Sequence, residues 1–167
     1  MSQAGSPPQK ENAVLSEFHE NAQRHDLPDW IKEHVELYHR DPVAAHEWDG
    51  SPLGGYPNTP TLMLTTRGRK SGKILEMPLL YGRDGDHIVI CGSKGGAPQH
   101  PAWFLNMEAM DVVDVQIKHD RFKAKWRLAK GDERQRLFEM MTKVYPPFPS
   151  YQARTPREIP VVVLERI

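Results

Sequence analysis

The sequence predicts an α+β fold in which about six short, mostly antiparallel strands form a small closed or half-closed β-barrel, with flanking helices and an N-terminal helical extension. Three observations support this prediction. Apolar residues recur at helical spacing before residue 60, whereas strand-like alternation dominates after it. Short glycine-containing turns separate the expected strands. With 167 residues, of which 38% are hydrophobic and 26% charged, the chain can bury one hydrophobic core.

The first sixty residues are expected to precede a barrel domain that covers 61–167. Residues 1–12 should form a polar tail, residues 13–25 and 26–40 two helices, and residues 49–60 a linker or lid. Glycines and prolines are too frequent in the last of these segments for a regular element. The first helix carries a narrow apolar stripe, Val14, Phe18 and Ala22, which could dock on the barrel, on a partner or on a membrane surface.

The barrel is expected to consist mainly of hairpins. The predicted strands are residues 61–66, 77–82, 87–92, 113–118, 122–128 and 160–165, and the predicted helices are 101–109 and 131–144. The Asp84-Gly85 dipeptide predicts a tight hairpin after the second strand, so the first three strands should form an antiparallel meander. Pro78 lies inside the second strand, which predicts either a bulge or an edge strand.

Two glycine-rich basic loops are the strongest functional candidates. In an up-down-up meander the first and third strands run the same way, so the loops that follow them, 67–73 and 92–96, should emerge at one edge. Glycines let consecutive backbone N–H groups face one anion, and Lys and Arg add charge-assisted hydrogen bonds. Together the loops predict a cradle for a phosphate or carboxylate. The alternative is a hairpin turn with solvated charges and a flexible connector.

An aromatic segment offers a second candidate surface. Tyr145, Phe148 and Tyr151 recur every three residues between prolines, which are expected to forbid a regular helix. These aromatic residues should therefore line a pocket wall or pack the chain against the barrel. A tyrosine in a pocket can bind an apolar ring and offer a proton.

Composition excludes several function classes. Lys plus Arg and Asp plus Glu balance at 22 each, so there is no global field to attract nucleic acid, and no nucleic-acid partner is expected. The single cysteine, Cys91, is expected to be a half-buried strand residue and suits a reducing compartment. No histidine or cysteine spacing predicts a metal site. With no signal-peptide pattern and no apolar stretch of spanning length, we expect a cytoplasmic protein, with contact to the inner face of the membrane as the alternative if the N-terminal stripe binds lipid.

Four motifs carry a resemblance to a known family. They are TTRGRKSG at 65–72, MPL at 77–79, GSKGGA at 92–97 and PAWFLN at 101–106. In this order and spacing, and continuing through VQI at 115–117 and IPV at 159–161, the chain resembles the deazaflavin (F420)-dependent nitroreductases and quinone reductases of actinobacteria. The resemblance covers roughly 61–165 and implies a split β-barrel. The N-terminal helices are only loosely similar to the family.

The resemblance also implies a cofactor, coenzyme F420, which is a deazaflavin with a phosphate and a polyglutamate tail. The residues that it implies in cofactor binding are Arg69, Lys70, Ser71, Met77, Pro78, Leu79, Ser93, Lys94, Ala102, Trp103, Phe104 and Asn106. Of these, Arg69, Lys70 and Ser71 would contact the anionic part of the cofactor, while Met77 and Pro78 would flank its ring system. The same split barrel could instead hold FMN, with the basic loops on its single phosphate.

The implied reaction is hydride transfer from reduced F420 to a small electrophilic acceptor, such as a quinone or a nitroaromatic compound. Tyr151, Tyr145 and Ser93 are the candidate catalytic residues, and Leu80, Phe148 and Tyr151 would line the substrate pocket. In nitroimidazole-activating members of the family, tyrosines stand in place of Leu80 and Phe148, and a basic residue stands in place of Leu75. We therefore expect retained F420 binding, an apolar acceptor and poor nitroimidazole activation. A non-catalytic F420 carrier is the alternative from another functional class.

Overall fold

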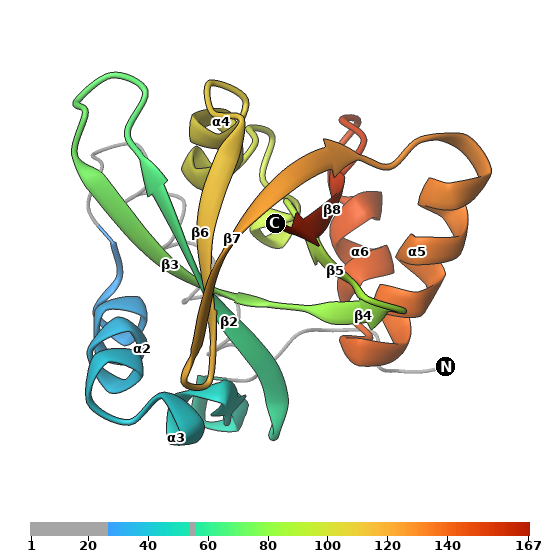
Figure 1. The fold of residues 1–167 in the computed structure, drawn as a ribbon. Helices are drawn as coiled ribbons and strands as arrows, with labels where there is room; N and C mark the ends of the chain where they lie inside the picture. The colour runs from blue at the N-terminus through green and yellow to red at the C-terminus, as the bar shows by residue number, and fades with distance from the viewer. Residues whose placement is uncertain (1–26, 54–55) are drawn as a thin grey trace.

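In the computed structural model, which describes residues 27–53 and 56–167, the chain forms a curled antiparallel half-barrel with helices around it (Figure 1). Within the described residues the sheet has eight strands, seven of them in the order β1-β2-β6-β7-β8-β5-β4, and β3 pairs with β2 off this path. The strands are β1 (Glu47–Trp48), β2 (Thr59–Arg67), β3 (Ile74–Leu80), β4 (Gly82–Asp84), β5 (His87–Cys91), β6 (Val112–Ile117), β7 (Asp120–Leu128) and β8 (Val161–Arg166). The predicted split-barrel class is confirmed.

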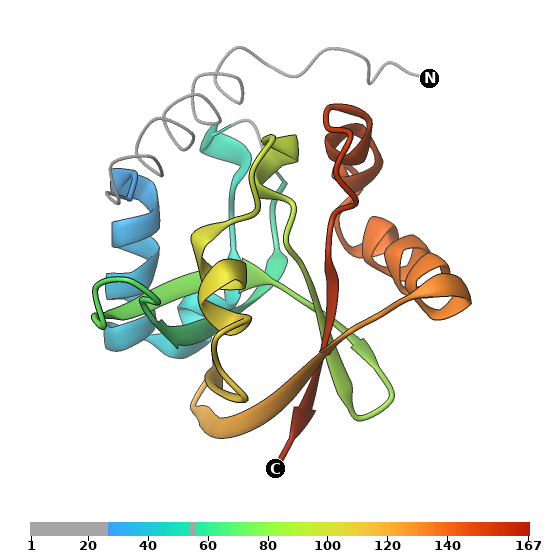
Figure 2. The same cartoon turned by 90° about the horizontal axis from the view of Figure 1, so that it is seen from above.

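The helices lie on two sides of this sheet. They are α2 (Asp29–Arg40), α3 (Pro42–His46), α4 (Ala102–Met107), α5 (Gly131–Val144) and α6 (Phe148–Ala153), with short 3₁₀ turns η1 (Ser51–Leu53) and η2 (Lys94–Gly96). Seen from above, α2 stands at one side of the half-barrel, α5 and α6 stand at the other, and α4 lies between them (Figure 2). No helix in the described part of the chain is long and apolar enough to cross a membrane.

The expected meander of the first three strands is wrong. β3 ends at Leu80 and pairs with β2 alone, whereas β5 pairs with β4 and β8. The Asp-Gly hairpin does form, but it joins β5 to the separate short strand β4 (Asp84 pairs with His87). β2 and β5 nevertheless run in the same direction, because β6, β7 and β8 lie antiparallel between them. The loops after β2 and β5 therefore leave the same edge of the sheet, for a reason different from the one predicted.

Prolines account for two further outcomes. Pro78 lies opposite Met63 on a strand with a single pairing partner, which confirms the edge-strand alternative. The expectation that prolines forbid a helix around Tyr151 is wrong, because α6 spans Phe148–Ala153. Pro149 is the second residue of that helix, and a backbone N–H in the first turn has no partner within the helix in any case. The segment 49–60, expected to be irregular, contributes the first two residues of β2, which begins at Thr59.

Two hydrophobic clusters share the strand β8, whose residues alternate between them. Val162 and Leu164 belong to the larger cluster inside the half-barrel, while Val161 and Val163 belong to the cluster under α5 and α6. Ile31 of α2 is part of the larger cluster and is only 2% exposed, so this helix is built onto the barrel core. The division of the chain at residue 60 stays a prediction, and the expected helix at 13–25 lies outside the described residues.

Candidate functional site

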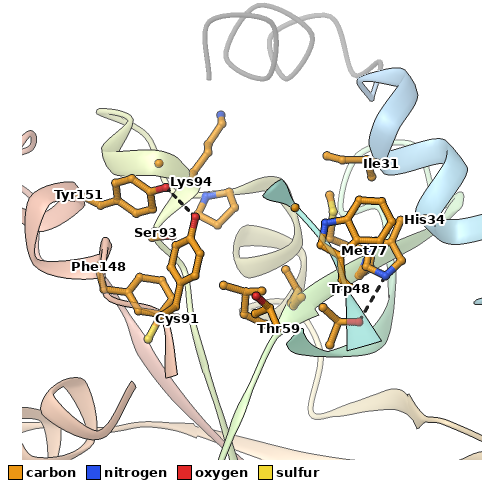
Figure 3. Close-up of a pocket in the computed structure, with 18 of the residues that line it drawn as sticks. Ile31, His34, Trp48, Thr59, Met77, Cys91, Ser93, Lys94, Phe148 and Tyr151 are labelled. Atoms are coloured by element: carbon orange, nitrogen blue, oxygen red, sulfur yellow. Dashed lines mark hydrogen bonds between the residues drawn. The ribbon is translucent and has the colours of Figure 1, made fainter. Parts of the chain in front are cut away.

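A cavity of about 230 Å³ opens between the half-barrel and the helices α2 and α6. Lys94, Phe148 and Tyr151 face Ile31, His34 and Trp48 across it (Figure 3). Its lining residues are Trp30, Ile31, His34, Trp48, Gly50, Tyr56, Thr59, Thr61, Met77, Pro78, Leu79, Leu80, Cys91, Ser93, Lys94, Gly95, Pro101, Trp103, Tyr145, Phe148 and Tyr151. Most of these side chains are apolar or aromatic, as in sites that bind flat organic rings.

Ten residues that the sequence singled out line this cavity. They are Met77, Pro78, Leu79, Leu80, Ser93, Lys94, Trp103, Tyr145, Phe148 and Tyr151. They come from β3, η2, α4 and the α5–α6 segment, so folding brings together parts of the chain far apart in sequence. The other six do not line it, namely Arg69, Lys70, Ser71, Ala102, Phe104 and Asn106.

The backbone of η2 has an unusual conformation beside the cavity. Lys94, Gly95 and Gly96 have consecutive positive φ angles of 45°, 63° and 82°. The left-handed region costs roughly 1–2 kcal/mol for a residue with a Cβ, so Lys94 is held there by its surroundings. Gly96 also packs closely on α6, where an added Cβ would lie 2.5 Å from the backbone oxygen of Tyr151. The chain thus presents Ser93, Lys94 and Gly95 to the cavity from a constrained turn.

The basic hairpin loop between β2 and β3 is tied to α4 by Asn106. The Asn106 Oδ1 accepts hydrogen bonds from the backbone N (3.1 Å) and the Nη1 (3.2 Å) of Arg69, and its Nδ2 donates to Thr66 Oγ1 (3.4 Å). Asn106 is only 3% exposed, so its amide holds the loop from the protein interior. The Ser71 Oγ accepts a hydrogen bond from the Lys73 backbone N (3.1 Å), and Lys70 is exposed. The hairpin loop is therefore a cationic surface whose backbone is held in place by a side chain of α4.

A pair of tyrosines forms one wall of the cavity. The hydroxyls of Tyr145 and Tyr151 lie 3.1 Å apart and share a hydrogen bond, drawn from Tyr151 in Figure 3. The Phe148 ring packs edge-on against both tyrosine rings, with centroid separations of 5.2 Å and 6.3 Å. This wall combines an apolar surface with two hydroxyl groups that can exchange a proton.

The opposite wall contains a buried histidine, His34, that was not among the residues singled out from the sequence. The His34 ring stacks on Trp48 at 4.0 Å and 13°, and its Nε2 donates to the Ala45 backbone oxygen (2.9 Å). Burial lowers the pKa of His34, and the bond to Ala45 offsets this only in part. A signal was available, because His34 lies three residues after Ile31, on the same face of the predicted second helix.

Cys91 also lines the cavity, but not as a nucleophile. It is the last residue of β5 and is 8% exposed, more buried than expected. Burial raises the pKa of its thiol to about 12, so the side chain stays protonated and behaves as a small apolar group. In the described ranges, no three His, Cys, Asp or Glu side chains are grouped in a way that could hold a metal ion.

Comparisons with known proteins place this geometry in a family. Residues 30–166 match the family model for F420H(2)-dependent quinone reductase. An F420H(2)-dependent quinone reductase of Mycobacterium tuberculosis H37Rv is 33% identical over 149 residues, which are 84% of this chain and 99% of that protein. The range matched by the family model includes both basic loops and all but the first residue of α2.

Solved structures agree with this match. An F420-H2 dependent reductase is 35% identical, with a TM-score of 0.58 over 63% of this chain and 93% of that chain. A structure described as a domain-swapped dimer is 32% identical, with a TM-score of 0.61 over 82% of this chain and 98% of that chain. Because the family model matches nearly the whole described chain, the protein belongs to the F420H(2)-dependent quinone reductase family.

Proposed function

We propose that the cavity holds the ring system of coenzyme F420 next to an apolar quinone, and that the basic hairpin loop binds the anionic tail of the cofactor. The chain is an oxidoreductase of an F420H(2)-dependent family, so F420 is its cofactor and a quinone is the named acceptor. The bound reduced deazaflavin supplies the hydride, while the protein supplies binding, orientation and a proton.

The residues present fit this cofactor. Met77, Pro78 and Trp103 offer apolar surfaces to a flat ring, and Ser93 and Lys94 offer a hydroxyl and a cation at the same cavity. The single observation that supports the proposal best is this combination of an apolar cavity with donors on a constrained glycine turn. Such a turn lets the backbone approach a ligand closely.

The cofactor tail would extend from the cavity toward the hairpin loop. In this arrangement Arg69, Lys70 and Ser71 contact the tail, and Asn106 acts mainly by holding the loop in place. Ser71 can still donate its hydroxyl proton while its oxygen accepts from Lys73. Ala102 and Phe104 contribute to α4 rather than to the cavity surface.

The acceptor would lie against the tyrosine wall. Leu80 and Phe148 give this part of the cavity an apolar surface, which suits a quinone better than a polar nitroimidazole. The Tyr151 hydroxyl then holds the proton for the acceptor oxygen, and Tyr145 can replace that proton through their hydrogen bond. Ser93 offers a second hydroxyl from the η2 side.

Binding experiments with two cofactors test the proposal. We expect the protein to bind F420, followed by fluorescence, and to bind FMN much more weakly. Reduced F420 should be oxidised rapidly with menadione as acceptor and slowly with a nitroimidazole. Tight FMN binding without F420 binding would contradict the assignment of the cofactor. F420 binding without oxidation by any quinone would indicate a carrier instead.

A variant of the hairpin loop tests the tail site. Lys70→Ala should weaken F420 binding roughly tenfold, the loss expected for one charge-assisted contact. The matched control is Lys143→Ala, which removes an exposed lysine from α5. Equal F420 affinity in the two variants would show that the tail lies elsewhere.

A further inference from the structure

The Arg157 guanidinium binds three backbone carbonyls in and beside the η2 turn, while Arg154 Nη1 donates to the Gly95 oxygen (3.4 Å). Arg157 lies between α6 and β8, and its Nε donates to the Ala97 backbone oxygen (2.8 Å). Its Nη2 donates to the Ser93 oxygen (2.8 Å), and its Nη1 donates to the Gly92 oxygen (3.1 Å). The Nη1 also contacts the Nδ1 of His100 at 3.1 Å. One side chain therefore binds three carbonyls of the segment 92–97 and the histidine that follows it.

These carbonyls belong to the turn that lines the cavity. Ser93 and Lys94, which line the cavity, lie in the same segment 92–97 that contains the three carbonyls bound by Arg157. The turn is strained at Lys94, where φ is 45°, and strained backbone persists only where neighbouring groups hold it. Its own hydrogen bonds are few, from Gly96 N to Ser93 O (2.9 Å) and from Ala97 N to Lys94 O (3.1 Å). Arg157 supplies most of the remaining bonds recorded for these carbonyls.

Arg157 is itself held in place by α6. Its backbone oxygen accepts from Gln152 Nε2 (2.7 Å), and its backbone N donates to Thr155 Oγ1 (3.3 Å). The Oε1 of Gln152 in turn accepts from Arg134 Nη2 (3.1 Å) on α5 and from the Ile159 backbone N (2.9 Å). Arg157 thus connects α5 and α6 to the segment 92–97.

The chemistry of this contact differs from an ion pair. Across residues 27–53 and 56–167 no salt bridge to Arg157 is recorded, whereas Arg127 and Arg136 both bind carboxylates. All the recorded partners of the Arg157 side chain are backbone carbonyls and an imidazole nitrogen. The rigid fork of five N–H donors is suited to several acceptors at fixed directions, which a lysine ammonium cannot match.

We propose that Arg157 is a positioning residue of the cofactor site, which holds the segment 92–97 so that Ser93 and Lys94 keep their place in the cavity. The assignment of those two residues to F420 rests on the function proposed above. His100 completes the arrangement as the fourth acceptor of the guanidinium. Arg157 does not line the cavity and acts through the backbone that it binds.

The test compares Arg157→Lys and Arg157→Met with Arg127→Lys. Arg127 makes three hydrogen bonds to Glu133 and Glu165 away from the cavity, so its variant matches the loss of arginine contacts. In the cofactor-free protein, hydrogen exchange in the peptide covering 92–101 should quicken in both Arg157 variants and stay unchanged in Arg127→Lys. F420 affinity should fall about tenfold in both Arg157 variants, with an unchanged KM for menadione.

Arg157→Lys is the decisive variant, because it keeps the positive charge and removes the planar guanidinium. Normal exchange and normal F420 affinity in Arg157→Lys would overturn the proposal. Weak F420 binding with normal exchange would overturn it as well, because it would indicate that the guanidinium itself contacts the cofactor. If Arg157→Met does not fold, His100→Ala removes one acceptor and should quicken exchange in the same peptide to a smaller extent. If the wild type does not bind F420, the proposed function is refuted. Faster exchange in the Arg157 variants would in that case still identify Arg157 as the residue that orders the segment 92–97.

Discussion

At the residue scale, the hydroxyl pair of Tyr145 and Tyr151 is the feature most directly connected to turnover. Tyr151 is 5% exposed, and the two oxygens lie 3.1 Å apart. Tyr151→Phe keeps the ring packing and removes the hydroxyl. We expect kcat with menadione to fall by about tenfold to a hundredfold, with unchanged F420 affinity, because proton transfer rather than binding is affected.

Stopped-flow oxidation of reduced F420 measures this effect. Tyr145→Phe is the companion variant and should have the smaller effect, since Tyr145 would only replace the proton of Tyr151. A wild-type rate for Tyr151→Phe would exclude this residue as the proton donor.

The buried His34 should make stability sensitive to acid. Burial lowers its pKa in the folded protein below the ordinary value near 6.5. The unfolded chain therefore binds a proton more readily than the folded chain, and stability is lost as the pH falls below about 6.5. His34→Gln can still donate to Ala45 but does not titrate. Between pH 7 and pH 5.5 the wild type should lose up to about 1 kcal/mol more than the variant.

Urea unfolding at the two pH values measures the difference. The variant is expected to be less stable than the wild type at pH 7, because it loses the stacking on Trp48. The pH dependence is the informative quantity, and an equal loss in both proteins would show that His34 is protonated without cost in the folded state.

At the element scale, the close packing of η2 on α6 depends on a glycine. A Cβ at Gly96 would lie 2.5 Å from the Tyr151 oxygen and 3.0 Å from the Arg154 Cβ, and φ is 82° there. Gly96→Ala should cost about 2–4 kcal/mol of stability and weaken F420 binding, because either the turn or α6 must move. Thermal or chemical unfolding and F420 titration measure the two effects.

Gly85 provides a matched control for this variant. Its φ is 61°, but nothing lies within 4 Å of an added Cβ. Gly85→Ala should therefore cost only the backbone strain, about 1 kcal/mol, and leave F420 affinity unchanged. If both variants lose the same stability, the contact between η2 and α6 is looser than the structure indicates.

Elements with regular patterns were predictable, and elements defined by their neighbours were not. The alternation in β6 and β7 and the periodicity of α5 were sufficient to predict them, because each has one buried and one solvated face. α6 was missed, since its helical residues follow two prolines and its stability comes from packing of Phe148 and Tyr151. β1 and β4 have two and three residues, too few to show any period.

At the scale of the whole molecule, β8 contributes residues to both hydrophobic clusters, so we expect the two clusters to unfold as one cooperative unit. Its residues alternate between the half-barrel and the layer under α5 and α6. Leu137→Ala, in the second cluster, should lower stability by about 2–5 kcal/mol. Of the four tryptophans, Trp103 lies in the first cluster and Trp30 and Trp126 pack against it. The midpoint measured by tryptophan fluorescence should therefore fall to the same lower value as the midpoint measured by far-UV circular dichroism. Separate midpoints would show that the clusters unfold independently.

The sequence by itself determined the fold class, the family, the two basic loops and ten of the residues that line the cavity. It could do so because hydrophobic periodicity and the spacing of motifs are properties of the chain alone. The expectation that Leu80 and Phe148 stand in place of tyrosines, and that the acceptor is apolar, stays a prediction.

Only the tertiary structure decided how these parts meet. It replaced the meander by a sheet in which β6, β7 and β8 separate β2 from β5, and it placed His34 and Trp48 opposite the tyrosine wall. It also assigned Asn106 and Arg157 to the backbone of the two loops. These contacts join residues 37 to 65 positions apart. Local patterns cannot specify such pairs, because the pairs depend on which surfaces the whole chain buries together.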